Sequence, residues 1–418
     1  MVTGMVAYEG EPSGPAQLPI ELSIIMPCLN EAETLATCIG KAKQYLERSG
    51  VAGEIVVGDN GSTDGSQDIA LRNGARVFKI PLKGYGAALY GASLAARGRY
   101  IVMADSDDSY DFSNLDPFLN QLRQGYDLVM GNRFKGGIRP EAMPWKNRYI
   151  GNPILSAIGK VFFRCPASDF HCGIRGYSKD AFMRMDLHTT GMEFASEMVI
   201  KATMMRMKIC EVPTVLSPDG RSRPPHLLPW RDGWRHLRFM LLFSPNWLFL
   251  YPGLLLMLVG LAGTIFLSLG QVRIQHVHFS IDTLIYCAFI IITGFQSVLF
   301  AVLSRVYAIQ ERLYPAGRLY NRLFRHINLE RGLVGGILVV LGGLASAVYA
   351  VLEWRRNGFG PLNIEHTSRI VIPSGLAITL GMEAILFSFF LSTLGMNVRQ
   401  HSTEPALEYT PSEVHAAS

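Results

Sequence analysis

Short apolar runs alternate with amphipathic stretches over roughly the first 240 of the 418 residues. The runs have the length of buried strands and lie at 22–27, 54–59, 75–80, 100–105 and 127–131. Helix-like segments such as 31–48 and 84–97 separate them. This alternation predicts a mainly parallel α/β sheet, and in such sheets binding chemistry belongs at the carboxyl ends of the strands.

The pattern changes beyond residue 240, where long stretches lose their charged faces. Only Glu383 carries a charge in the four stretches 239–272, 283–304, 332–352 and 370–398. About 20 apolar residues cross a bilayer core, so these stretches predict four transmembrane helices rather than one buried helical core, which would need charged outer faces. Buried charges inside spans are costly, and we therefore expect Glu383 to make a hydrogen bond between helices.

Charge sets the expected orientation of the spans. Six arginines occupy the loop 305–331, whereas the loop 273–282 has one, Arg273. The positive-inside rule places the Arg-rich loop in the cytoplasm, and an even number of spans then places both ends of the chain there. The first twenty residues lack a basic start followed by an apolar core, so no signal peptide is expected.

These patterns divide the chain into five segments. They are a flexible N-terminus (1–20), an α/β domain (21–228), an interfacial amphipathic helix (229–243), a four-helix transmembrane domain (244–399) and a disordered cytoplasmic tail (400–418). The interfacial helix is predicted because Trp230 and Trp234 alternate with arginines just before the first span. An ordinary positively charged flank is the alternative interpretation.

Composition excludes some functions. A net charge of +5 is too small to indicate nucleic acid, and no nucleic-acid partner is expected. Six cysteines without a CxxC pair fit a reducing compartment.

Three motifs carry candidate chemistry. Asp105 and Asp107 follow the apolar run YIVMA, and carboxylates two residues apart after a strand can share a divalent cation with diphosphate oxygens. In EIVVGDNGSTDGS, Asp59 ends a strand and could accept hydrogen bonds from a nucleobase. In SIIMPCLNEAETL, Pro27 precedes Glu31, which opens a helix. Each motif taken singly has an ordinary structural interpretation. The Asp105 and Asp107 motif can be a solvated acidic turn, the Asp59 motif a capped βα turn, and the Glu31 motif a first helical turn in which a negative charge is favourable.

Taken in this order, the three motifs resemble the inverting family-2 glycosyltransferases of the GT-A fold. GNRF (131–134), SDFHCGIRGYS (168–178) and four C-terminal spans narrow the resemblance to the branch acting on polyprenyl phosphates, such as dolichol-phosphate mannose synthases and undecaprenyl-phosphate glucosyltransferases. The resemblance covers residues 20–240 in detail and the membrane part in outline. It implies transfer of a hexosyl group from a UDP- or GDP-sugar to undecaprenyl or dolichyl phosphate, in a plasma or bacterial inner membrane.

The resemblance also implies residue roles. They are Pro27, Glu31 and Asp59 lining the nucleoside pocket, Lys83 reaching the donor, and Asp105 and Asp107 holding Mg²⁺ or Mn²⁺ and the sugar diphosphate. Arg133 and Arg175 are expected to hold the acceptor phosphate, and Arg221 and Arg223 to reach it from a basic loop over the site. Two positions depart from the family. Asn60 replaces a second acidic residue, and Ser109 stands where mannose synthases have a Gln metal ligand, which weakens a mannose-specific interpretation.

The expected mechanism needs no general base. A phosphate monoester loses its second proton near about pH 6, so the nucleophile is already mostly a dianion at neutral pH. Fixed guanidinium groups can hold it next to a diphosphate. Glu193 and Glu197 are candidate helpers or helix-surface residues, and His171 beside Cys172 lacks partners at metal-ligand spacing.

The sequence disfavours three other functions. A processive polysaccharide synthase usually has spans before its catalytic domain and a QxxRW motif, and the sequence has neither. A non-catalytic scaffold would have lost the acidic motif or the arginines. A lipid transporter would need a polar path through the spans. The sugar, the nucleotide, the lipid length and any homo-oligomer stay open.

Overall fold

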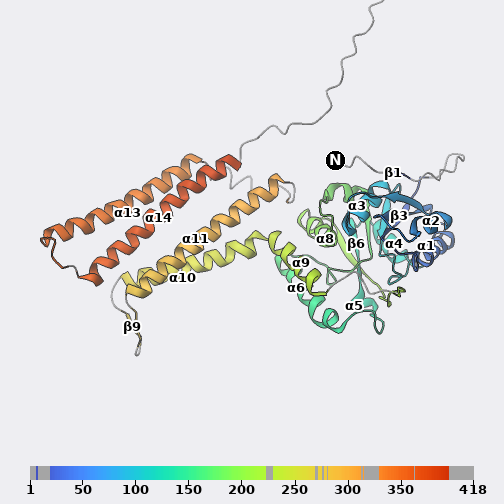
Figure 1. Ribbon diagram of the computed structural model, residues 1–418, viewed down its shortest axis with the longest axis horizontal. Coiled ribbons are helices and arrows are strands. Elements are labelled where there is room, and N and C mark those ends of the chain that lie inside the picture. The colour runs from blue at the N-terminus through green and yellow to red at the C-terminus, as the bar shows by residue number, and fades with distance from the viewer. Residues whose placement is uncertain are drawn as a thin grey trace, which may run out of the picture. The chain divides into compact units, whose positions relative to one another are not determined.

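A computed structural model of the chain describes residues 6–7, 19–222, 229–268, 272–274, 277–279, 281–311, 314, 329–361 and 363–394. These residues fall into two compact units (Figure 1), which are described separately. The first contains the described residues of Met1–Leu256 and Gln296–Gly317, and the second those of Met257–Phe295 and Arg318–Ser418.

The first unit is built on an eight-stranded sheet of order β1-β4-β3-β2-β5-β7-β6-β8. The strands are β1 (Val6–Ala7), β2 (Leu22–Cys28), β3 (Gly53–Asp59), β4 (Arg76–Lys79), β5 (Tyr100–Met103), β6 (Leu128–Asn132), β7 (Arg175–Ser178) and β8 (Ile209–Pro213). Neighbours β4, β3, β2 and β5 run parallel, as do β6 and β8, whereas β7 lies antiparallel between β5 and β6. The five strands expected from the sequence are present, and the mainly parallel α/β fold is confirmed.

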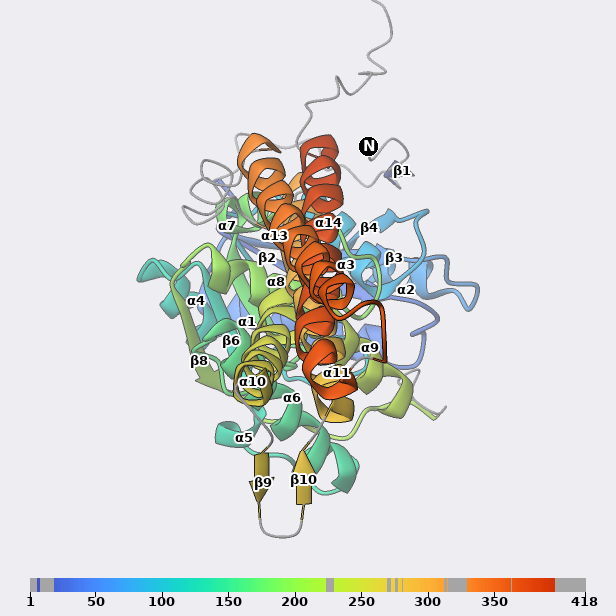
Figure 2. The same ribbon diagram turned by 90° about the vertical axis from the view of Figure 1, so that its left-hand side faces the viewer.

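Helices cover both faces of this sheet (Figures 1 and 2). They are α1 (Leu35–Ser49), α2 (Ser66–Arg72), α3 (Tyr85–Ala95), α4 (Asp116–Arg123), α5 (Arg133–Gly136), α6 (Asn152–Phe163), α7 (Lys179–Met185) and α8 (Phe194–Met204). Side chains alternate along each strand: Ile24 and Met26 join the core cluster that includes α1 and α4, whereas Ile25 joins the one that includes α3 and α8.

Helix α9 (Pro229–Leu242) matches the amphipathic segment predicted before the first span. Its inner face places Phe239 and Met240 in the second core cluster, and its outer face leaves Trp234 and Leu242 more than half exposed. Tyr314, from the Arg-rich loop, stacks on Phe243 just after the helix and donates a hydrogen bond to its carbonyl oxygen. Helix α9 is thus fixed to the α/β domain along one side.

In the described part of the chain, four helices are long and apolar enough to cross a membrane. They are Asn246–Ser268 (the π-helical turn η2, Asn246–Leu250, with α10, Tyr251–Ser268), α11 (Ile281–Gln310), α13 (Leu329–Arg356) and α14 (Ile364–Leu394). Their most apolar windows have mean hydropathies of 1.9 to 2.1. The four spans predicted from the sequence are confirmed. A hairpin of β9 (Val272–Ile274) and β10 (Val277–Phe279) lies between the first two spans in the sequence. The hairpin was not predicted.

Helices α13 and α14 lie side by side in the second unit (Figures 1 and 2). Small residues seven apart are buried in their contact: Gly336, Gly343 and Ala350 on α13, and Ser374, Gly381 and Ser388 on α14. A Cβ at Gly381 would lie only 2.7 Å from the carbonyl oxygen of Gly336. Ser374 donates a 2.7 Å hydrogen bond to the carbonyl oxygen of Gly343. The two backbones are therefore in direct contact.

Candidate active site

The carboxyl ends of the strands bring the sequence motifs together. Asp59 ends β3, Asp105 follows the end of β5 and Asn132 ends β6, all at one edge of the sheet. Pro27, near the end of β2, is buried beneath this edge, where its carbonyl oxygen accepts a 2.6 Å hydrogen bond from Ser106. The sheet thus places the two acidic motifs beside each other, as parallel topology requires.

Asp105 is held by Tyr85, the first residue of α3, whose hydroxyl donates a 2.8 Å hydrogen bond to it. The 168–178 segment closes over the same carboxylate, since a Cβ at Gly173 would lie 2.7 Å from its Oδ2. Enclosure by protein, followed by the charge of Asp107, raises the pKa of Asp105 to about 6. The site therefore favours a positive charge beside this carboxylate.

In this structure the guanidinium of Arg221 supplies a positive charge to the carboxylates next to Asp105. Arg221 donates one hydrogen bond to Asp107 and another, of 3.1 Å, to Glu31. Its side chain is only 10% exposed, so solvent screens these ion pairs weakly. Ser109 donates a 2.6 Å hydrogen bond to Asp107 and orients the carboxylate. Arg221 was expected over the acceptor phosphate, but it lies in the expected cation and nucleoside region.

The backbone around Arg221 is attached to the same site. The amide of Gly220 donates to the carbonyl oxygen of Asp107 at 2.9 Å. Ser222 donates from its amide and its hydroxyl to Glu33, at 2.7 and 2.6 Å. Residues 219–222 therefore lie across the acidic motif. Arg223 is outside the described residues.

Asp59 organises its own loop. Its carboxylate accepts hydrogen bonds from the amides of Gly61 and Ser62, each 3.1 Å, and from Gln67 at 3.0 Å. Asn60, where the resemblance implies an acidic residue, donates to the carbonyl oxygen of Leu82 at 2.8 Å and accepts from the amide of Gly84 at 2.7 Å. A carboxylate could not donate to that carbonyl, which explains why an amide suits this chain.

Lys83 belongs to the same arrangement. Its ammonium group donates a 2.7 Å hydrogen bond to the carbonyl oxygen of Asn60, so it lies on the side of the site that the Asp59 loop borders. Gly84 has φ +132°, and a Cβ there would collide with the carbonyl oxygen of Thr190. That oxygen accepts a 3.0 Å hydrogen bond from the amide of Ala87. The Lys83 turn and the 188–193 segment are thus packed backbone to backbone.

The two arginines expected to hold the acceptor phosphate are otherwise engaged. Arg133 forms a buried bidentate pair with Asp169, at 2.8 and 2.7 Å. Arg175 is fully buried and donates to the carbonyl oxygens of Cys172 at 2.9 Å, Phe170 at 3.2 Å and Ala195. In this conformation neither guanidinium faces an open site, so the structure argues against a direct phosphate contact by either one.

The candidate helpers also have other partners. Glu197 is fully buried, pairs with Lys201 at 3.0 Å, and accepts hydrogen bonds from the amides of His188 and Thr189. It therefore fixes the 188–193 segment. His171 stacks edge-on against His236, and burial, followed by that neighbour, lowers the pKa of His171. No cluster of three or more metal-ligating side chains was found within the described ranges.

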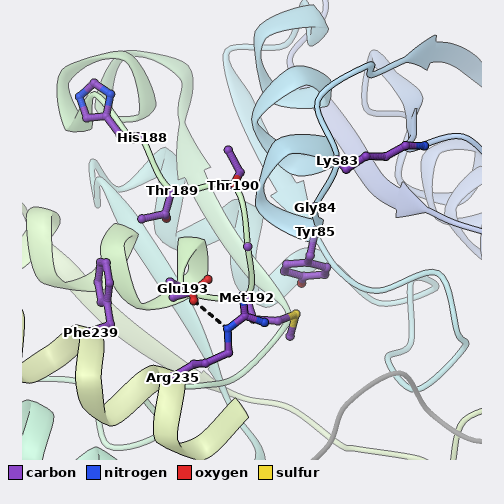
Figure 3. A pocket seen from close by; sticks show the side chains of 11 residues that line it. Lys83, Gly84, Tyr85, His188, Thr189, Thr190, Met192, Glu193, Arg235 and Phe239 are labelled. Atoms are coloured by element: carbon purple, nitrogen blue, oxygen red, sulfur yellow. Dashed lines mark hydrogen bonds and ion pairs between the residues drawn. The ribbon is translucent and has the colours of Figure 1, made fainter. Parts of the chain in front are cut away.

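A cavity of about 540 Å³ opens between the start of α3, the 188–193 segment and α9 (Figure 3). Its lining residues are Lys83, Gly84, Tyr85, His188, Thr189, Thr190, Gly191, Met192, Glu193, Arg235 and Phe239. Tyr85 connects this cavity to the acidic motif, because the ring lines the cavity while the hydroxyl binds Asp105. Neither the cavity nor the role of Tyr85 was predicted from the sequence.

Comparison with known proteins decides the family. Residues 23–185 match "Glycosyl transferase family 2", and residues 302–395 match "Glycosyltransferase family 2 C-terminal transmembrane region". Over 376 residues the chain is 38% identical to "Low-salt glycan biosynthesis hexosyltransferase Agl6" of Haloferax volcanii, covering 90% of this chain and 89% of that protein. The chain belongs to glycosyltransferase family 2. The family resemblance inferred from the motifs is thus confirmed, and the apolar helices make this glycosyltransferase an integral membrane protein.

Other similar proteins cover less of this glycosyltransferase. "Dolichyl-phosphate hexose transferase" of Haloferax volcanii is 31% identical over 194 residues, which is 46% of this chain and 81% of that protein. Among solved structures, glucosyl-3-phosphoglycerate synthase from Mycobacterium tuberculosis in complex with Mn²⁺, UDP and glucosyl-3-phosphoglycerate is 22% identical. It covers 53% of this chain and 77% of its own, with a TM-score of 0.42.

Proposed function

We propose that this glycosyltransferase moves a hexosyl group from a nucleoside diphosphate sugar to a polyprenyl phosphate in the membrane. The observation that carries the proposal is the acidic motif at the sheet edge, with Asp105 and Asp107 beside Glu31, in a chain whose next domain is four apolar helices. Similarity to a hexosyltransferase and to a dolichyl-phosphate hexose transferase supports the same substrate classes.

The residues at this edge fit a divalent cation. Asp105 and Asp107 offer hard oxygen ligands, and Arg221 already places a positive group against Asp107. Mg²⁺ is commonly held by one or two carboxylates and completed by substrate phosphates, which agrees with the two carboxylates here. When bound, Mg²⁺ or Mn²⁺ stabilises the negative charge of the leaving nucleoside diphosphate. Ser109 and Tyr85 fix the orientations of Asp107 and Asp105, the two carboxylates that would hold the cation.

In the proposed reaction an oxygen of the lipid phosphate attacks the anomeric carbon. A C–O bond forms there, and the bond to the nucleoside diphosphate breaks, with its electron pair leaving on the diphosphate. The attacking phosphate is mostly a dianion at neutral pH, so no general base is required. What the protein supplies is position and fixed positive charge.

The reaction is proposed to take place at the cytoplasmic face of the membrane. Helix α9 leads into the first span and exposes Trp234 and Leu242. Ile154 of α6, a helix that packs against α9, and Trp145 and Tyr149 just before α6 are also more than half exposed, on a segment that contains cationic residues. Amphipathic surfaces of this kind lie in the headgroup layer, where a lipid phosphate is found. The positive-inside asymmetry of the loops sets the side.

The test uses the full-length protein with labelled UDP- and GDP-sugars. A short polyprenyl phosphate and the matching polyprenol are compared as acceptors, with EDTA and then with Mg²⁺ or Mn²⁺ restored. We expect transfer only to the phosphate, and only with the cation. The Asp107→Asn variant should insert normally into the membrane and lose transfer. Equal transfer to the free alcohol would overturn the proposal, and an active Asp107→Asn variant would remove the cation assignment.

A further inference from the structure

The cavity beside the acidic motif contains an ion pair that the proposed donor site does not use. Glu193 and Arg235 face each other across 3.1 Å, and Figure 3 shows the pair on the side of the cavity nearest α9. The Arg235 side chain is 43% exposed and that of Glu193 is 15% exposed. The Arg235 side chain is therefore partly open to solvent, whereas that of Glu193 is largely covered.

The cations that line the cavity have separate positions. The ammonium group of Lys83 donates to the carbonyl oxygen of Asn60, on the side of the Asp59 loop. Arg235 comes from α9, the helix that leads into the membrane. Tyr85 lies between them in Figure 3 and contacts Asp105 through its hydroxyl. An anion that arrives from the α9 side would meet Arg235 before it reached the acidic motif.

Relying on the function proposed above, we infer that Arg235 binds the phosphate monoester of the acceptor lipid and that Glu193 is its partner in the absence of acceptor. The guanidinium exchanges a carboxylate for a phosphate dianion, which it can bind through two parallel hydrogen bonds. Arg133 and Arg175 do not compete for this role, since Asp169 and backbone carbonyl oxygens already bind them. Phe239, one turn further along α9, provides an apolar wall in the same cavity.

The exchange predicts opposite effects for the two members of the pair. Arg235→Ala removes the phosphate ligand and should raise the KM for polyprenyl phosphate at least about tenfold, the loss of one charge-assisted hydrogen-bonding group. Glu193→Gln removes the resting partner and should lower that KM at least twofold. Arg235→Lys keeps the charge without the planar fork and should fall between Arg235→Ala and wild type. The KM for the nucleotide sugar should stay within twofold in all three variants.

A matched control lies on the same helix. Arg238 is an exposed arginine of α9 that does not line the cavity, so Arg238→Ala removes the same charge without touching the proposed site. Its KM for polyprenyl phosphate should stay within twofold of wild type.

A separate assay measures thermal unfolding of the wild type and of the Arg235→Ala variant. It compares the protection given by a short polyprenyl phosphate, by the matching polyprenol and by inorganic phosphate. If polyprenyl phosphate is the only one of the three ligands that protects, and if it protects wild type but not Arg235→Ala, the bound phosphate belongs to the lipid.

The assignment fails if Arg235→Ala and Glu193→Gln change the acceptor KM in the same direction, because a pair that merely anchors α9 would respond in that way. It also fails if Arg238→Ala matches Arg235→Ala, or if inorganic phosphate protects wild type as well as the lipid does. If wild type uses polyprenol as readily as polyprenyl phosphate, the proposed function itself is wrong. If wild type requires the phosphate and Arg235→Ala is unaffected, only the Arg235 assignment is wrong.

Discussion

Removal of the Arg221 guanidinium should strengthen the binding of a divalent cation to the acidic motif. In the structure this group is hydrogen-bonded to Asp107 and Glu31, so a cation that uses Asp107 has to displace it. The displacement opposes binding in proportion to the free energy of the ion pairs that are lost. Arg221→Ala abolishes this competition and keeps both carboxylates.

The size of the effect follows from burial. Hydrogen bonds between charged groups contribute about 1.5–3 kcal/mol net. With Arg221 only 10% exposed, solvent should not reduce that contribution to the level of a surface pair. If the cation breaks only the contact with Asp107, about 1.5 kcal/mol is recovered, which is roughly a tenfold lower Kd.

The assay is Mn²⁺ binding to the full-length protein without nucleotide, followed by the EPR signal of free Mn²⁺. Omitting the nucleotide excludes any contact between Arg221 and the donor diphosphate. Lys41→Ala is the control, since Lys41 pairs at 2.6 Å with the neighbouring Asp108 and its removal also deletes one positive charge near the motif. The reasoning is refuted if Arg221→Ala binds Mn²⁺ no more tightly than Lys41→Ala does.

Three further changes test the buried framework. Arg175→Lys should destabilise the fold by about 2–4 kcal/mol and so lower the thermal midpoint, because the arginine binds backbone carbonyl oxygens. The acceptor KM should not change, and a raised KM with normal stability would contradict this. Glu197→Gln should cost about 3–5 kcal/mol by stranding Lys201, and Glu197→Leu with Lys201→Met should recover part of it in the same melting assay. Although burial opposes it, hydrogen bonds from Ser168 and other neighbours lower the pKa of Glu211 to about 2. This stabilisation is complete above the unfolded pKa of about 4.3 and disappears as the pH falls towards 2, so the thermal deficit of Glu211→Gln should shrink below about pH 4; a deficit independent of pH would count against it.

The sheet could be predicted from the sequence because its strands repeat one simple pattern. Each of the five predicted runs is apolar, and three end in polar residues that the parallel topology gathers at one edge. Strand β7 was not predicted, since RGYS is short and polar and is placed only by its pairing with β5 and β6. The spans could be predicted for the opposite reason, because a helix with no charge over about 20 residues has no face suited to water and is stable chiefly within a bilayer.

The site was harder to predict, because residue type does not reveal which partner a charged group will find. Arg175 looks like a phosphate ligand in the sequence, yet three backbone carbonyl oxygens bind it in the fold. Nothing in the sequence indicates that Arg221 reaches Asp107, 114 residues away. The contact of Tyr85 with Asp105 likewise depends on where α3 begins. One signal was available: Lys83 lies next to glycines, and glycine is required where two backbones pack closely.

The glycine and serine contact between α13 and α14 limits where a long isoprenoid tail can run. A Cβ at Gly381 would lie 2.7 Å from the carbonyl oxygen of Gly336, and Ser374 is hydrogen-bonded to Gly343, so at these positions the two backbones leave no room for a methyl-branched chain between them. The tail of the proposed polyprenyl substrate would therefore run along the outside of this pair or beside another helix. A bulky side chain at Gly381 should force the two helices apart and create a gap that the native protein does not contain.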